Sequence, residues 1–252
     1  MIRAIIVSGE GVTDLGASKM GLTVSEGEDI EVGPALLLIY KLIYLYAPDW
    51  YREMYDWTAD VPIPTYLISR GERSRVSKTL KPNLFQTQSS GRGGIEHAKG
   101  AWALGQIAVE YEANLCFYFH DTDGTQALLR KTPDLQDIIV KGASKGFDIQ
   151  DIIGIAVVPK PTSEAWFICH ANTPPYQHCH LLETNLAGNQ DSEERSPKVY
   201  LANLLGRSRV VRDDLIELAR EVDVERLDMP SFNQFKRDVQ LALESIFGGR
   251  AR

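Results

Sequence analysis

Cysteine is scarce in this sequence, with only three in 252 residues. An odd, sparse set of this kind argues against a secreted scaffold held by disulfides and fits a reducing, cytoplasmic location. The sequence has no basic start followed by an apolar stretch, so we expect no signal peptide. Its longest apolar run, ALLLIYKLIYLYA (35–47), contains a lysine and is too short to span a bilayer. The run therefore predicts a buried helix, and we expect no membrane partner.

Positive charge is not in excess either, since 27 Lys and Arg stand against 34 Asp and Glu, a net charge of −7. The charge of the whole chain therefore does not favour nucleic acid as a partner. It does not exclude nucleic acid, because a metal-dependent site is itself acidic and phosphate contacts can be local. No GxxxxGK[ST] motif occurs, which argues against a nucleotide-binding enzyme of the P-loop type.

The sequence does contain an alternation of strand and helix patterns. Short apolar segments rich in β-branched and aromatic residues predict strands at 2–8, 64–69, 114–119 and 151–159. Helical patterns follow at 34–46, 95–112, 134–146 and 161–171, and a polar loop is expected at 22–34. This order predicts an α/β fold in which helices cover both faces of a parallel sheet, joined by right-handed crossovers.

We expect one α/β domain over residues 1–175, with a loop and helical C-terminal extension (176–252) packed on it. Within the domain, residues 70–100 hold seven Lys and Arg against two Glu, and a Ser/Gly-rich stretch at 86–94. This composition predicts a flexible basic segment. Such a segment is either a solvated surface or an arm that contacts nucleic-acid phosphates through Arg70, Arg73, Arg75, Lys78 and Arg92.

Acidic residues follow three of the predicted strands. Ligands of a parallel α/β sheet bind beyond the carboxyl ends of its strands, so these residues are expected at one edge. Carboxylate oxygens suit Mg²⁺ or Mn²⁺, and a pair of such ions can hold the attacking and leaving oxygens of a phosphodiester. A lysine, Lys160 or Lys198, would neutralise charge that develops on the phosphate. The candidate ligands are Glu10 and Asp14, then Asp121 and Asp123, then Glu164.

Two of these segments, IIVSGEGVTD (5–14) and CFYFHDTDG (116–124), together resemble the Toprim domain. A third, IAVVPKPTSEAWFICHAN (155–172), is similar to a Toprim-like bacterial family related in pattern to the OLD-type nucleases, as is MPSFNQFKRDVQLAL (229–243). The resemblance implies a Toprim-like, Rossmann-like fold. It makes Glu10 the acid/base or metal glutamate, Asp121 and Asp123 metal ligands, and Glu164 a second-metal ligand or structural partner. An alignment slipped by two residues would place Ser8 at the glutamate position instead.

The resemblance implies a metal-dependent nuclease that hydrolyses phosphodiester bonds in nucleic acid, with DNA favoured over RNA as the substrate. A bacterial defence or repair setting beside an ATPase partner is implied in the same way. The alternative is a non-catalytic Toprim-like scaffold or sensor subunit that binds metal weakly or not at all. The sequence leaves the oligomeric state open.

Each candidate residue also has a simpler interpretation. Asp121 and Asp123 are also typical of a turn that ends a strand. Asp14 can cap the following helix, and Glu164 can interact with a helix dipole. Two cysteines and three histidines within 169–180 raise the question of a zinc site, although the spacing of common zinc sites is absent and a loop is favoured. His120 is expected to be structural, or to support a neighbouring ligand.

Overall fold

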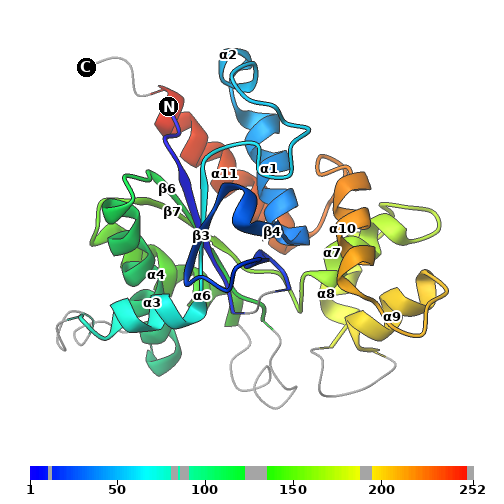
Figure 1. Ribbon diagram of the computed structural model, residues 1–252. Coiled ribbons are helices and arrows are strands. Elements are labelled where there is room, and N and C mark those ends of the chain that lie inside the picture. Colours follow the sequence, from blue (N-terminus) through cyan, green and yellow to red (C-terminus); the bar gives the residue numbers. More distant parts are fainter. Residues whose placement is uncertain (11–12, 81–84, 86–90, 123–134, 188–194, 249–252) are drawn as a thin grey trace.

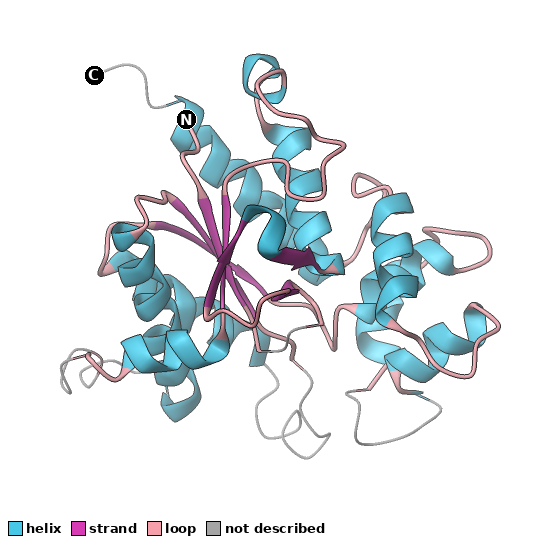
Figure 2. Cartoon of the chain, in the orientation of Figure 1, coloured by secondary structure: helices cyan, strands magenta, loops and turns pink. Residues whose placement is uncertain are grey.

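The computed structural model describes residues 1–10, 13–80, 85, 91–122, 135–187 and 195–248 (Figures 1 and 2). Its centre is a five-stranded sheet with the order β3-β5-β1-β6-β7. Four strands run parallel to one another and match the four predicted from the sequence, while β3 pairs antiparallel with β5. The strands are β3 (Val24–Glu26), β5 (Thr65–Ile68), β1 (Ile5–Ser8), β6 (Leu115–Phe119) and β7 (Ile153–Val157).

The prediction of a loop at 22–34 is wrong. This stretch holds β3, the short helix η1 (Gly27–Asp29) and β4 (Ile30–Val32), and β4 pairs antiparallel with β2 (Gly16–Ser18). Both pairings depend on backbone hydrogen bonds at a sheet edge, where one side of a strand stays exposed. Polar residues are therefore tolerated there, and the apolar pattern that reveals a central strand is missing.

Helices cover both faces of the sheet, and alternate residues of each strand point to opposite faces (Figure 1). On one face, Ile6, Cys116 and Tyr118 pack in a core with α4 (Gly91–Glu110) and α6 (Leu135–Asp148), beside α3 (Arg70–Ser77). On the other, Val7, Phe117 and Phe119 lie in a larger core to which several helices contribute, four of them long enough to cover this face. These are α1 (Pro34–Tyr46), α7 (Glu164–Ala171), α10 (Arg212–Glu221) and α11 (Pro230–Gly248).

Helices of the C-terminal part contribute to this larger core. Trp166 is fully buried, its ring lies 4.9 Å from that of Phe232, and its Nε1 donates to Ser231 Oγ at 2.9 Å. Phe235 packs against Phe117 of β6. The sheet and the C-terminal helices therefore share one apolar core. The shorter helices are α2 (Asp49–Arg52), η2 (Cys179–Leu181), α8 (Leu182–Asn185) and α9 (Pro197–Leu204).

The basic segment predicted to be flexible is in large part helical. Residues 70–77 form α3, whose N-terminus is capped by Ser69, where the side-chain oxygen accepts from Glu72 N at 3.1 Å. Helix α4 begins at Gly91, four residues before its predicted start. Residues 81–84 and 86–90, which include most of the Ser/Gly-rich stretch, lie outside the described residues.

Cys169 and Cys179 form a disulfide, with 5.2 Å between their Cα atoms. The sparse cysteine count did not lead us to expect this bond, because only the fold brings α7 next to η2. The two cysteines of the Cys/His cluster are therefore bonded to each other, and His170 Nδ1 lies 2.6 Å from the Tyr176 hydroxyl. Within the described part of the chain, no helix is long and apolar enough to cross a membrane.

Candidate functional site

Ser8 and Glu10, the two candidates for the glutamate position of the Toprim pattern, lie in different surroundings at the end of β1. Ser8 is fully buried, and its hydroxyl donates to Ile68 O at 2.9 Å while accepting from Arg73 Nη1 at 3.1 Å. Glu10 lies two residues beyond the strand, with 40% of its side chain exposed. Glu10 is therefore the residue whose carboxylate is accessible at this edge, and Ser8 serves to anchor Arg73.

The Glu10 carboxylate belongs to a cluster with histidine and arginine. Its Oε1 lies 2.9 Å from His120 Nε2, while His120 Nδ1 lies 2.7 Å from the backbone oxygen of Asp121. Both neighbours are acceptors, so both hydrogen bonds form only when the ring carries two protons. The hydrogen bond from His120, with the charges of His120, Arg70 and Arg73, holds the pKa of Glu10 below its usual value despite partial burial.

A second group of carboxylates surrounds Ser163, at the N-terminus of α7. The Ser163 hydroxyl donates to Asp14 Oδ1 at 2.8 Å, and its backbone N–H donates to Asp121 Oδ1 at 3.2 Å. The next residue, Glu164, is 5% exposed, and its Oε1 lies 3.7 Å from Lys198 Nζ. Burial raises the pKa of Asp14 above its usual value, and the charge of Glu164 adds to that effect. Negative charge is therefore concentrated here in a partly buried place.

The donor chemistry of this second group fits a hard divalent cation, because all of its acidic groups are carboxylates. Among the described residues, however, no three Asp, Glu, His or Cys side chains converge as ligands of one ion. Asp123, the remaining candidate ligand, lies outside the described residues. Asp14 does not cap α1 with its side chain, since its backbone oxygen accepts from Ala35 N at 2.8 Å.

A small cavity of about 200 Å³, which we call the polar pocket, opens between α3, α4 and the end of β6. The Arg73 guanidinium lies over the Tyr118 ring, 4.9 Å from its centroid. His97 Nδ1 lies 3.1 Å from the Tyr118 hydroxyl, and the ring of His97 is 4.4 Å from that of His120. Burial, and then the charge of His120, lower the pKa of His97 to about 4. The pocket is lined by Glu10, Arg70, Arg73, Ser74, Ser77, Glu96, His97, Lys99, Gly100, Tyr118 and His120.

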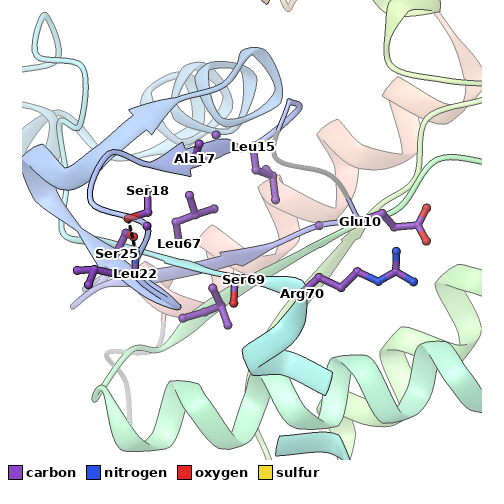
Figure 3. A pocket seen from close by; sticks show the side chains of 13 residues that line it. Glu10, Leu15, Ala17, Ser18, Leu22, Ser25, Leu67, Ser69 and Arg70 are labelled. Atoms are coloured by element: carbon purple, nitrogen blue, oxygen red, sulfur yellow. Dashed lines mark hydrogen bonds between the residues drawn. The ribbon is translucent and has the colours of Figure 1, made fainter. Parts of the chain in front are cut away.

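A second cavity, of about 230 Å³, lies on the other side of Glu10 and Arg70. Its lining is mostly apolar and includes Leu15, Leu22 and Leu67 (Figure 3). Figure 3 shows the side chains of Glu10 and Arg70 extending away from this cavity in a common direction. Their charged ends therefore belong to the polar pocket, which both residues also line.

The other Arg and Lys residues that were predicted to contact phosphate lie at different places in the structure. Arg75 is exposed and pairs with Glu72 through Nε at 2.9 Å, and Lys78 is exposed at the C-terminal end of α3. Lys198 faces Glu164, whereas Lys160 is half-buried and interacts electrostatically with Glu183. The side chain of Arg92 lies outside the described part. The structure thus brings Arg70 and Arg73 to Glu10 and Lys198 to Glu164.

The sequence does not single out several residues of the polar pocket, among them His97, Lys99 and Tyr118. His97 and Lys99 lie two apart on a helix of ordinary amphipathic pattern, and Tyr118 lies inside a buried strand. No motif marks them, because only the packing of α4 on β6 brings them together. Comparisons with protein-family models, with curated proteins and with solved structures found no match.

Proposed function

We propose that this protein is a metal-dependent nuclease that hydrolyses phosphodiester bonds at the carboxyl edge of its sheet. One observation gives the main support. The partly buried carboxylates of Asp14, Asp121 and Glu164 gather around Ser163, while Arg70 and Arg73 lie beside Glu10 a short way along the same edge. A hard cation and a phosphate would each meet groups of the opposite charge.

In this proposal Asp121, with either Asp14 or Glu164, would hold Mg²⁺ or Mn²⁺, and Asp123 remains a further ligand predicted from the sequence alone. When bound, the ion would polarise the phosphodiester and lower the pKa of a bound water. Lys198 Nζ lies 3.7 Å from Glu164 Oε1 and would balance the negative charge of Glu164 when the metal is absent. Lys160 is favoured less as a phosphate contact, since its electrostatic partner is Glu183.

Glu10 and His120 would supply the proton transfer of the reaction. The Glu10 carboxylate is accessible, and His120 both orients it through Nε2 and is itself fixed through Nδ1 by the backbone of Asp121. The geometry favours Glu10 as the group that accepts a proton from an attacking water. DNA as the substrate, an ATPase as a partner and a defence or repair setting rest on the Toprim resemblance alone.

The test is cleavage of plasmid and single-stranded DNA in the presence of Mn²⁺. Wild type is expected to nick or cleave, and a Glu10→Gln, Asp121→Asn double variant is expected to lose at least about a hundredfold in rate. Circular dichroism of both proteins controls for folding. Equal rates in the two proteins would rule out this site as the catalytic centre.

A non-catalytic scaffold or sensor is the second candidate. The observation in its favour is the ion pair between Glu10 and His120, which occupies the carboxylate that would otherwise be available for catalysis. Calorimetric titration with Mn²⁺ separates the two candidates. Binding that is weakened in Asp121→Asn supports the nuclease, and the absence of binding to wild type supports the scaffold.

A further inference from the structure

The polar pocket contains two guanidinium groups that lie near the Glu10 carboxylate without forming an ion pair with it. Arg73 is only 8% exposed, and the one hydrogen bond that its guanidinium makes to a described residue goes to Ser8. Arginine has five N–H donors, so most of those on Arg73 remain available. Neither Arg70 nor Arg73 forms an ion pair with any carboxylate of the described residues.

The acidic residues of the pocket already have partners. Glu10 pairs with His120 at 2.9 Å, and Glu96 pairs with Lys99 at 3.0 Å. The pocket lining therefore holds three Arg and Lys side chains, Arg70, Arg73 and Lys99, against two Glu, in a protein whose net charge is −7. Burying a cation without a counter-ion is unfavourable, and burial lowers the pKa of the Arg73 guanidinium. A bound anion would remove this cost.

We propose that the polar pocket binds the terminal phosphate monoester of a nucleic-acid strand, held by Arg70 and Arg73. The nature of the ligand rests on the proposed nuclease function, whereas the binding of a phosphate group rests on the pocket itself. The nuclease would then recognise a strand end and act near it.

Charge and size both favour a terminal phosphate over an internal one. A phosphate monoester has a charge of roughly −1.5 to −2 at neutral pH, so two guanidinium groups attract it more strongly than they attract an internal phosphodiester, which has a single charge. The fork of N–H donors on arginine fits phosphate oxygens in a bidentate manner. The cavity of about 200 Å³ is smaller than the roughly 300 Å³ at which pockets for whole drug-sized ligands begin. The pocket therefore suits a single group rather than a nucleotide.

The first measurement is calorimetric titration with inorganic phosphate in the presence of EDTA, so that no metal contributes. We expect wild type to bind, and Arg70→Gln and Arg73→Gln each to lose at least about tenfold in affinity. Arg220→Gln is the matched control, because Arg220 is an exposed arginine on α10 that pairs with Asp60. It should bind phosphate as wild type does.

The second measurement compares three single-stranded oligonucleotides of one sequence: one with a 5′-phosphate, one with a 3′-phosphate and one with neither. We expect one phosphorylated form to bind at least about tenfold more tightly than the unmodified form, and Arg70→Gln to abolish the difference. Arg70 is exposed, so this variant decides the outcome even if Arg73→Gln fails to fold. Equal binding of all three strands would overturn the proposal, as would phosphate binding that neither arginine affects.

The two proposals fail in different ways. If the protein binds phosphate through Arg70 but cleaves no DNA with Mn²⁺, the proposal of a phosphate-binding pocket is supported and the proposal of a nuclease is refuted. If the protein cleaves DNA in a way that depends on Asp121 but its pocket binds no phosphate, the proposal of a nuclease is supported and the proposal of a phosphate-binding pocket is refuted.

Discussion

At the scale of single residues, the candidate site contains titratable side chains whose pKa is shifted by burial and by neighbouring charges. His97 is the clearest case, since burial and the adjacent His120 lower its pKa to about 4. Asp14 is another, because it shares a partly buried place with Glu164. Residues with shifted pKa values are common where a protein binds ligands.

His97 should make the stability of the protein depend on pH. Between its folded pKa of about 4 and the usual value of 6.5, the unfolded chain binds more protons at this residue than the folded one. Its contribution to the free energy of unfolding is therefore full above pH 6.5 and is lost on acidification towards pH 4. We expect a loss of about 1–2 kcal/mol from this residue, discounted for its partial exposure. Urea unfolding of wild type and His97→Gln between pH 4 and 7 measures it, and parallel curves would contradict it.

Asp14→Asn should stabilise the metal-free protein. The amide oxygen can still accept from Ser163 Oγ, while the repulsion from Glu164 disappears. We expect a gain of about 0.5–1 kcal/mol in the free energy of unfolding in EDTA. Thermal unfolding with and without Mn²⁺ gives the comparison. A loss of stability in EDTA would show that the carboxylate has a structural role that this account omits.

At the scale of the elements, the strand ends were predictable and the helix contacts were not. Each of β1, β6 and β7 is an apolar run that ends close to a polar residue, so its end and the residues beyond it follow from the pattern. The sequence analysis therefore found Glu10, Asp121 and Glu164. Whether a helix places a histidine against a strand depends on helix-to-sheet packing, which amphipathicity does not specify. This is why His97 on α4 was missed.

The contact between α4 and α6 depends on a glycine. A Cβ atom on Gly146 would lie 2.2 Å from Ala98 O and 2.7 Å from Trp102 N, which are backbone atoms. Gly146→Ala should therefore push the two helices apart and destabilise the protein by about 1–3 kcal/mol. Gly71→Ala is the control, because a Cβ there has only Ser69 Oγ near it, at 3.8 Å, and α3 should become slightly more stable. Similar midpoints of urea unfolding for both variants would contradict this packing.

At the scale of the whole molecule, a net charge of −7 coexists with a local excess of positive charge at one pocket. The net charge follows from the sequence, but the excess of positive charge at the polar pocket depends on the fold. Seven cations occur in residues 70–100, yet of the described ones only Arg70 and Arg73 face Glu10, and Arg75 pairs with Glu72 instead. The sequence located the basic segment, and the fold selects which of its cations are available.

Binding of single-stranded DNA should therefore depend only weakly on salt. With two guanidinium groups at the pocket, the slope of log K against log salt concentration is expected to be about −1.4, roughly −0.7 for each cation that contacts a single strand. Fluorescence anisotropy between 50 and 200 mM salt measures the slope. A slope steeper than about −5 would mean that many more cations contact the strand than those of the polar pocket.

We propose that the carboxyl edge of the sheet holds a divalent cation. A crystal structure of the protein grown with Mn²⁺ tests it most directly, through the anomalous difference map. We expect a peak with carboxylate oxygens of Asp121, and of Asp14 or Glu164, within about 2.0–2.4 Å. A map without a peak at this edge, from crystals in saturating Mn²⁺, would contradict the claim.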